Sequence, residues 1–215
     1  MMKNFDFSLY LVTDRILSQP RTVEEVVRMA VKGGVTAVQL REKDISTKEF
    51  VTTARRIKEI LQPFNVPLII NDRIDVAVAV DADGVHIGQQ DMPCDIARRL
   101  LGKEKIIGLS VETMEQALEA ENLDVDYLGV SPIFLTPTKS EIQTQWGIEG
   151  LKELRSRVRK KLIAIGGINT SNAQAVLEAG ADGLAVVSAI CAAGDPELAA
   201  QELKSIIENF KRRQQ

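Results

Sequence analysis

The chain has 215 residues, of which 45% are hydrophobic and 27% are charged, and its formal net charge is −3. This balance argues against nucleic acid as a partner, because duplex-binding proteins usually carry a strong basic excess. The sequence contains no apolar run of membrane-spanning length and no charged-then-apolar leader over residues 1–12, so we expect a cytoplasmic protein that does not bind membranes. Cys94 and Cys191 lie outside any CxxC or Cys/His cluster and are expected to be packed free thiols.

Short apolar segments rich in Val and Ile alternate with amphipathic segments of helical length along the whole chain. Strands that are apolar nearly throughout are typical of a parallel sheet buried on both faces. The predicted strands are Ser8–Asp14, Ala37–Lys43, Pro67–Asp72, Gly84–Gly88, Ile106–Val111, Tyr127–Pro132, Leu162–Ile168 and Gly183–Ile190. Eight strands leave about 27 residues per unit, which is close to a compact βα repeat. We therefore predict an α/β protein, a single (β/α)8 TIM barrel domain over residues 1–215. A doubly wound sheet is the competing architecture, and the lack of a glycine-rich dinucleotide turn disfavours it.

Signals for helix boundaries support this division. Three capping boxes of the form S/T-x-x-E/Q stand at Thr22/Glu25, Ser46/Glu49 and Thr113/Gln116. Asp195 precedes Pro196 as an N-cap before a proline at the first helical position. Left-handed C-caps are expected at Gly33-Gly34, Gly102 and Gly180.

A weak internal repeat leads into the second, fourth, sixth and eighth predicted strands. Its four copies are KGGVTAVQL, VDADGVHIG, NLDVDYLGV and EAGADGLAVV. Alternate strands of a barrel fill the same interior layers, so a shared pattern on the even strands fits a barrel. Any turn from a helix to a strand also favours Gly and Asp, which gives the repeat a simpler origin.

The second predicted strand ends in charge, in the segment AVQLREKD. Side chains alternate along a strand, so Gln39, Arg41 and Lys43 share one face while Val38 and Leu40 take the other. In a barrel the polar face looks inward, toward the C-terminal mouth where barrel active sites lie. Two inward cations need an anion, because unpaired buried charge is costly. The alternative is that carboxylates of the barrel itself neutralise both cations.

Two carboxylates follow the third and fourth predicted strands. Asp72 ends the segment IIND, and Asp91 ends GQQD. Each is also a candidate N-cap for the helix that follows it. Together, beside an expected anion site, they favour a hard cation such as Mg²⁺, which binds carboxylates and phosphate oxygens.

The remaining strand ends add polar groups to the expected mouth. Ser110 is free for the mouth because Thr113 already caps the next helix. The long loop after the sixth strand carries Thr136, Thr138 and Lys139 and is either a lid or a solvated surface loop. The loops after strands seven and eight often form a backbone phosphate site in this fold, here at Gly166-Gly167, Val187 and Ser188. His86, mid-strand, is expected to be a packed core residue, with a catalytic role as the alternative, and Trp146 is expected to be a packing residue.

Eight motifs occur in this order, each at a predicted strand or strand end: YLVTD, QLREK, IIND, GVHIGQQD, GLS, TPTK, IGGI and VVSAI. As a set they resemble the thiamin phosphate synthase (thiamin-phosphate pyrophosphorylase) family over nearly the whole chain. The resemblance implies a transferase that joins hydroxymethylpyrimidine diphosphate to a thiazole phosphate, yielding thiamin phosphate and pyrophosphate with Mg²⁺ as cofactor. It leaves the oligomeric state open, and a homo-oligomer is compatible with it.

The resemblance also assigns residues to ligands. The pyrimidine diphosphate would contact Gln39, Leu40, Arg41, Glu42, Lys43, Asn71, Ser110 and Lys139. The thiazole phosphate would contact Thr136, Pro137, Thr138, Gly167, Val187 and Ser188. Asp72 and Asp91 would bind the metal. Arg41, Lys43 and Lys139 would be the catalytic residues that stabilise the leaving pyrophosphate.

The residue inventory agrees with a dissociative reaction, which the resemblance implies. The carbon–oxygen bond breaks first, and the thiazole nitrogen then attacks with its lone pair, so no nucleophile–base pair is needed. The chain offers no Ser–His–Asp set and has one isolated histidine. Three alternatives stay open: a thiazole tautomerase-like or regulatory paralogue, a non-catalytic phosphate-metabolite binding protein, and another phosphate-handling barrel such as an epimerase or aldolase.

Overall fold

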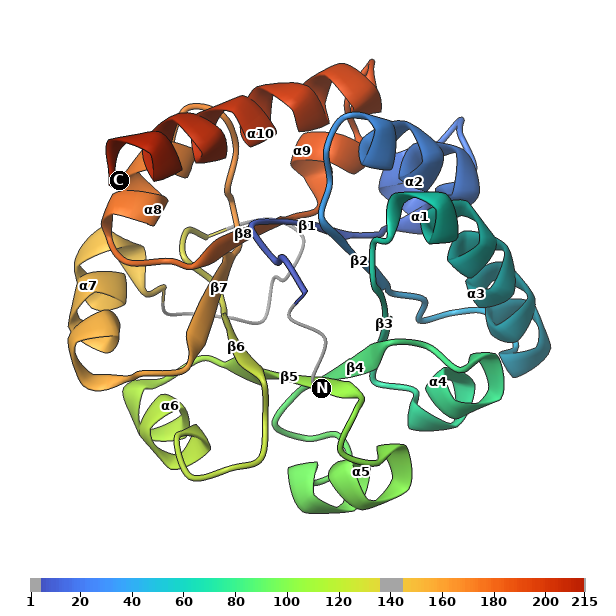
Figure 1. The fold of residues 1–215 in the computed structure, drawn as a ribbon, viewed down its shortest axis with the longest axis horizontal. Coiled ribbons are helices and arrows are strands. Elements are labelled where there is room, and N and C mark those ends of the chain that lie inside the picture. The colour runs from blue at the N-terminus through green and yellow to red at the C-terminus, as the bar shows by residue number, and fades with distance from the viewer. Residues whose placement is uncertain (1–4, 136–144, 215) are drawn as a thin grey trace.

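The computed structural model of the chain describes residues 5–135 and 145–214. In this part of the chain, eight parallel strands pair in sequence order and close into a barrel (Figure 1). The strands are β1 Leu9–Val12, β2 Ala37–Leu40, β3 Leu68–Asn71, β4 Gly84–Ile87, β5 Ile106–Val111, β6 Tyr127–Val130, β7 Lys161–Ile165 and β8 Gly183–Val186. The predicted (β/α)8 barrel is therefore confirmed, and the doubly wound alternative is excluded.

Helices surround the strands on the outside of the barrel (Figure 1). They are α1 Arg15–Ser18, α2 Val23–Lys32, α3 Thr47–Leu61, α4 Ile74–Val80, α5 Cys94–Leu101, α6 Met114–Ala120, α7 Gly147–Arg157, α8 Ala173–Glu178, α9 Ser188–Cys191 and α10 Pro196–Arg213, with a 3₁₀ turn η1 at Gln62–Phe64. Within the described ranges, none of these helices has the length and apolar character that a membrane span requires. Cys94 and Cys191 are free and buried, as expected.

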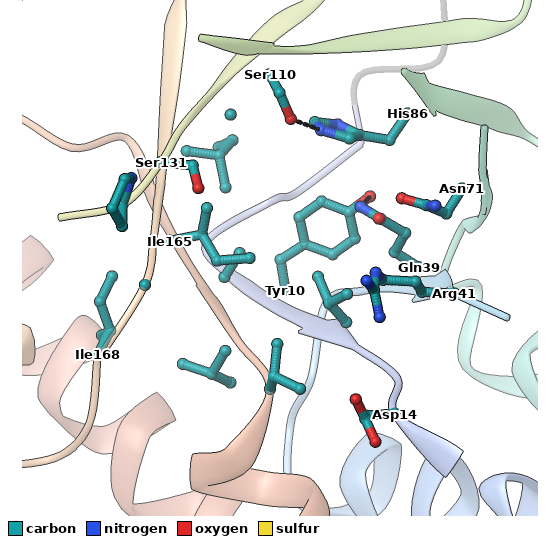
Figure 2. Close-up of a pocket in the computed structure, with 18 of the residues that line it drawn as sticks. Tyr10, Asp14, Gln39, Arg41, Asn71, His86, Ser110, Ser131, Ile165 and Ile168 are labelled. Atoms are coloured by element: carbon teal, nitrogen blue, oxygen red, sulfur yellow. Dashed lines mark hydrogen bonds between the residues drawn. The ribbon is translucent and has the colours of Figure 1, made fainter. Parts of the chain in front are cut away.

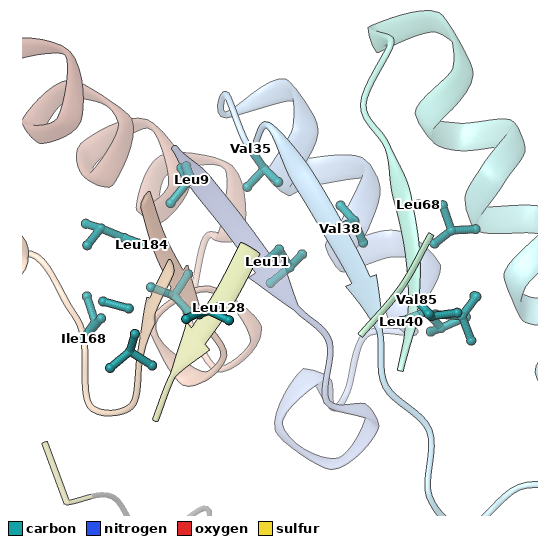
Figure 3. Packing of buried hydrophobic residues seen from close by; sticks show 14 of the residues in the cluster. Leu9, Leu11, Val35, Val38, Leu40, Leu68, Val85, Leu128, Ile168 and Leu184 are labelled. Atoms are coloured by element: carbon teal, nitrogen blue, oxygen red, sulfur yellow. The ribbon is translucent and has the colours of Figure 1, made fainter. Parts of the chain in front are cut away.

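Buried side chains form two cores, separated by the wall of strands. Leu9, Leu11, Val38 and Leu40 belong to the outer core between strands and helices (Figure 3). The inner core fills the barrel with Phe7, Tyr10, Val12, Ala37, Ile69, Ile106, Tyr127, Ile163 and Ala185. The alternation along β2 thus places Val38 and Leu40 outward, as the sequence predicted.

Several strands end earlier than predicted. β2 stops at Leu40 rather than Lys43, because the N–H of Arg41 donates to the hydroxyl of Thr13 (3.0 Å) instead of continuing the ladder. β8 stops at Val186, and α9 begins at Ser188 within the segment predicted as strand. The residues that were predicted as strand but lie beyond the observed strand ends surround the C-terminal mouth of the barrel.

The predicted caps are largely present. Thr22 forms a full capping box, in which its side chain accepts from the N–H of Glu25 and the Glu25 side chain accepts from that of Thr22. Ser46 and Thr113 each accept the expected N–H of the third helical residue, and Asp195 caps α10. Left-handed φ values occur at Gly34, Gly102 and Gly180.

Gly33 is the exception among the predicted C-caps, since its φ is −74° and therefore right-handed. A Cβ there would lie 2.3 Å from the carbonyl oxygen of Glu197 in α10. Glycine is required at this position by the close approach of two helices, not by backbone conformation.

The internal repeat corresponds to four pairs of hydrogen bonds at the N-terminal edge of the barrel. Each pair joins the residue before an even-numbered strand to the preceding odd-numbered strand, and we call each pair a bracket. The residue before each even strand accepts the N–H of a residue in the preceding odd strand. The four bonds are Leu9 N to Thr36 Oγ1 (3.0 Å), Leu68 N to Asp83 Oδ2 (3.0 Å), Ile107 N to Asp126 Oδ2 (2.8 Å) and Leu162 N to Asp182 Oδ2 (2.8 Å). In return, the N–H of each bracket residue donates to the carbonyl of the same partner. The repeat therefore has a structural cause at the barrel edge, rather than the interior-layer cause predicted from the even strands.

Loss of one bracket is expected to weaken the fold measurably. Asp126→Ala removes the acceptor of a partly buried N–H and one carboxylate partner of Arg98, so we expect a loss of about 1.5–3 kcal/mol of unfolding free energy. Asp124→Ala is the matched control, because Asp124 also pairs with Arg98 but is 72% exposed, and it should cost at most about 1 kcal/mol. Urea unfolding of both variants tests this, and equal losses would contradict the role of the bracket.

Candidate active site

A cavity of about 130 Å³ opens at the C-terminal mouth of the barrel. Its walls include apolar side chains of the strand interiors, namely Val12, Ile163, Ile165 and Ala185. The polar side chains of Gln39, Arg41, Asn71, His86 and Ser110 gather on the opposite side (Figure 2). Such a cavity suits a flat ring on its apolar wall and a charged group on its polar side.

Arg41 is held at the mouth through its backbone. Its N–H donates to Thr13 Oγ1, and the N–H of Thr13 in turn donates to the carbonyl of Gln39 (2.9 Å). Among the described residues, no carboxylate pairs with the Arg41 guanidinium, which lines the cavity. In the described part of the chain, the carboxylates of the barrel therefore do not neutralise Arg41. Its guanidinium is available to bind an anion in the cavity.

Lys43 behaves differently from Arg41. Its Nζ lies 2.5 Å from Asp72 Oδ2, so this cation is paired within the barrel. Lys43 does not line the cavity itself and stands at the rim, half exposed. The expectation of two unpaired inward cations is therefore met by Arg41 alone.

Asp72 and Asp91 lie side by side at the same rim. Neither is a helix N-cap, since the cap residues of α4 and α5 are Arg73 and Pro93. Asp91 accepts the N–H of Gly88 (2.7 Å). Burial raises the pKa of the Asp91 carboxyl, and the neighbouring Asp72 carboxylate raises it further. Two facing carboxylates repel unless a cation lies between them, so this pair suits a hard divalent cation.

This pair falls short of a complete protein cage. The described residues contain no group of three or more His, Cys, Asp or Glu side chains able to bind a metal. A Mg²⁺ ion commonly takes one or two carboxylates and completes its octahedron with water and phosphate oxygens. The two carboxylates therefore fit a metal that arrives with a phosphate ligand.

Two of the predicted contact residues turn away from the cavity. Leu40 is fully buried in the outer core. Glu42 accepts two hydrogen bonds from Arg15, at 2.8 Å and 3.1 Å, and its side chain is 3% exposed. Both have the even-numbered parity of the outward face, and neither lines the cavity.

The loops after β7 and β8 border the cavity through Gly167, Val187 and Ser188. In the described part, the N–H groups of Gly167 and Ser188 make no loop hydrogen bond, and Ser188 is the first residue of α9, where no helical partner exists. Gly166 and Gly167 have φ values of +107° and +66°. Their missing side chains would meet Pro132 and Phe134, so packing against the β6 loop is by itself enough to require this glycine pair.

The predicted residues Thr136, Pro137, Thr138 and Lys139 lie outside the described residues. Trp146 packs against the outer core at the start of α7, as expected.

Sequence reasoning missed part of the cavity wall. Thr13, Tyr10 and Tyr127 line it, and all three are buried. Reading the inward-facing parity of every strand, rather than the strand ends alone, would have found both tyrosines. His86 is buried as predicted, and it also lines the cavity, where it bonds Ser110 and Tyr127.

The family model described as thiamine monophosphate synthase matches residues 9–190 of this chain. The chain belongs to this family. The thiamine-phosphate synthase of Albidiferax ferrireducens is 56% identical over 93% of this chain and 91% of that protein. The enzyme of the same name from Syntrophomonas wolfei is 54% identical over 96% of this chain and 99% of that protein.

Solved structures agree with the family assignment. A thiamine phosphate pyrophosphorylase from Pyrococcus furiosus superposes with a TM-score of 0.87 at 40% identity, covering 95% of this chain and 97% of that one. A 3-hexulose-6-phosphate synthase has a TM-score of 0.70 at 16% identity, covering 93% and 99%, which shows a common fold only. The resemblance found in the sequence motifs is therefore confirmed for this member of the thiamine monophosphate synthase family.

Proposed function

We propose that this protein condenses hydroxymethylpyrimidine diphosphate with a thiazole phosphate to give thiamin phosphate and pyrophosphate. Family membership supports the transferase activity. The observation that carries the assignment to this cavity is the guanidinium of Arg41, which lines it without a carboxylate partner among the described residues. A diphosphate supplies the missing anion, since guanidinium binds phosphate oxygens in a bidentate fashion. A cytoplasmic location and a homo-oligomer stay predictions.

Arg41 and Lys43 would contact the diphosphate from the loop after β2, while Asn71 and Ser110 would contact it from β3 and β5. Gln39, on the inward face beside Arg41, would contact the pyrimidine. Asp72 and Asp91 would bind Mg²⁺, which when bound neutralises charge on the diphosphate. Lys139 is proposed as a third cation from the loop after β6.

The chemistry asks for charge stabilisation rather than proton transfer. The bond between the pyrimidine methylene carbon and the diphosphate oxygen breaks, and its electron pair leaves with pyrophosphate. The thiazole nitrogen then forms the new carbon–nitrogen bond with its lone pair. Arg41 and Lys43 stabilise the charge that grows on the leaving oxygen, which is the role of a preorganised electrostatic site. The apolar wall at Ile163 and Ile165 keeps water from the cationic intermediate.

The phosphate of the thiazole would bind at the loops after β7 and β8. This is supported by Gly167, Val187 and Ser188, which line the cavity, and by the N–H groups of Gly167 and Ser188, which make no loop hydrogen bond in the described part. Thr136, Pro137 and Thr138 are proposed to complete it. The two ligands therefore meet across the cavity, with separate anion sites on opposite sides.

Ser188→Glu tests this two-part arrangement. It places a carboxylate where the thiazole phosphate binds, and like charges in contact repel. We expect at least about a 30-fold rise in KM for the thiazole phosphate, equal to about 2 kcal/mol, with near-normal binding of the pyrimidine diphosphate in the presence of Mg²⁺. Calorimetric titration of each ligand measures both effects.

Ser188→Gln is the matched control, because it adds the same bulk without charge and should weaken the thiazole phosphate much less. Equal loss of both ligands by Ser188→Glu, in a protein that still folds, would contradict a separate phosphate site.

A further inference from the structure

Five polar side chains from five different strands form one continuous row of hydrogen bonds along the cavity. In order they are Gln39, Tyr10, Tyr127, His86 and Ser110, and all five line the cavity. The four links measure 3.0, 2.9, 3.0 and 2.8 Å. Figure 2 shows Tyr10 beside Gln39, and the bond from His86 to Ser110. The row joins the two ends of the proposed pyrimidine diphosphate site through three residues that the proposed reaction does not otherwise use.

The first link sets a direction that the other three links can continue. The Nε2 of Gln39 can only donate, so the Tyr10 oxygen accepts. Tyr127 is the remaining partner of the Tyr10 hydroxyl within the described residues, so the Tyr10 proton lies on the bond to Tyr127.

The same reasoning continues to the far end of the row. Tyr127 accepts from Tyr10, so its own proton lies on the bond to Nδ1 of His86. Along the row, Nδ1 of His86 then accepts and Nε2 donates to Oγ of Ser110, which is the tautomer that the proposal requires.

The environment keeps the two phenols protonated and in place. Burial raises the pKa of both Tyr10 and Tyr127. Their rings pack edge to face with centroids 6.0 Å apart, and Phe7 contacts both. Each hydroxyl thus carries one proton and has a fixed position, which is what a directional row requires.

We propose that Tyr10, Tyr127 and His86 are positioning residues that fix the hydrogen-bonding polarity of both ends of the row. The carbonyl oxygen of Gln39 is left to accept from a ligand, and it has no partner among the described residues. The hydroxyl proton of Ser110 is left to donate to a ligand.

This polarity sets substrate specificity, an inference that rests on the proposed function. The acceptor at Gln39 matches the 4-amino group of the pyrimidine, and the donor at Ser110 matches a diphosphate oxygen. A pyrimidine with a 4-carbonyl in place of the 4-amino group would set two acceptors against each other. Two buried acceptors that face each other without a proton cost free energy, so the site should bind the 4-carbonyl analogue poorly.

The protonation of His86 can be measured directly, since it is the one histidine of the chain. In tag-free protein labelled with ¹⁵N-histidine, without ligand, the long-range ¹H–¹⁵N spectrum should show one neutral ring with a bare Nδ1 and a protonated Nε2. A protonated Nδ1 would reverse the row and overturn the proposal. The result does not depend on turnover, so it stands apart from any failure of the proposed reaction.

The effect on specificity is tested with Tyr10→Phe, which frees the Gln39 amide to rotate. For wild-type protein we expect kcat/KM for the 4-amino diphosphate to exceed that of the 4-carbonyl analogue by at least about 10²-fold, and for Tyr10→Phe by less than about 10-fold. Phe7→Leu is the control, because it disturbs the same aromatic packing but keeps every hydroxyl, and its ratio should stay as in wild type. An unchanged ratio in Tyr10→Phe, or an equal fall in Phe7→Leu, would overturn the proposal.

Discussion

Arg41→Ala is expected to lower kcat by on the order of 10²- to 10³-fold. The guanidinium faces the cavity without a carboxylate partner in the described part of the chain, so its charge is available to the leaving diphosphate. Negative charge on that group increases as the carbon–oxygen bond breaks, and an interaction that strengthens in the transition state raises kcat. Steady-state kinetics with both substrates and Mg²⁺ in excess measures the change.

Two further variants sharpen this result. Arg41→Lys keeps the charge but loses the planar fork, so it should recover only part of the activity. Arg99→Ala removes an exposed arginine of α5, remote from the cavity, and should leave kcat within about twofold. If Arg41→Ala raised KM alone with kcat unchanged, Arg41 would be a binding residue without a catalytic role.

Removal of the metal, or of one of its proposed ligands, is expected to have an effect of similar size. Asp91→Asn keeps an acceptor for the N–H of Gly88 but removes the charge, so the local loop should persist while turnover falls by on the order of 10²-fold or more. Wild-type protein in EDTA should lose its activity and regain it when Mg²⁺ is added.

The matched control is Asp95→Asn, in the first turn of α5 and exposed. It removes the same charge four residues further on, away from Asp72, and should change kcat by no more than about twofold. Full activity of the wild type in EDTA would contradict the proposed role of Asp72 and Asp91.

The barrel was predictable because its signals are local. Apolar strands and capping residues such as Thr22 and Asp195 act within a few positions of the chain, and the structure bears them out. The strand ends were not predictable, since they depend on contacts between distant segments. The N–H of Arg41 leaves the ladder for Thr13, which is 28 positions away.

The site was predicted in part for the same reason. Strand parity placed Gln39 and Arg41 inward correctly. Parity could not show that Lys43 forms an ion pair with Asp72, or that Glu42 forms one with Arg15. Both pairs join segments that follow different strands. The hydrogen bond between the hydroxyls of Tyr10 and Tyr127 joins residues 117 positions apart, so no local sequence pattern predicts it.

In the proposed reaction, this cavity couples loss of pyrophosphate to the joining of two heterocycles. The most direct measurement supplies purified protein with hydroxymethylpyrimidine diphosphate, the thiazole phosphate and Mg²⁺, and quantifies thiamin phosphate and pyrophosphate in the same samples over time. Both products should form in equal amounts, and neither should accumulate over many turnovers when the thiazole phosphate is left out. Binding of both substrates without either product, or release of pyrophosphate with no thiamin phosphate, would contradict this coupling.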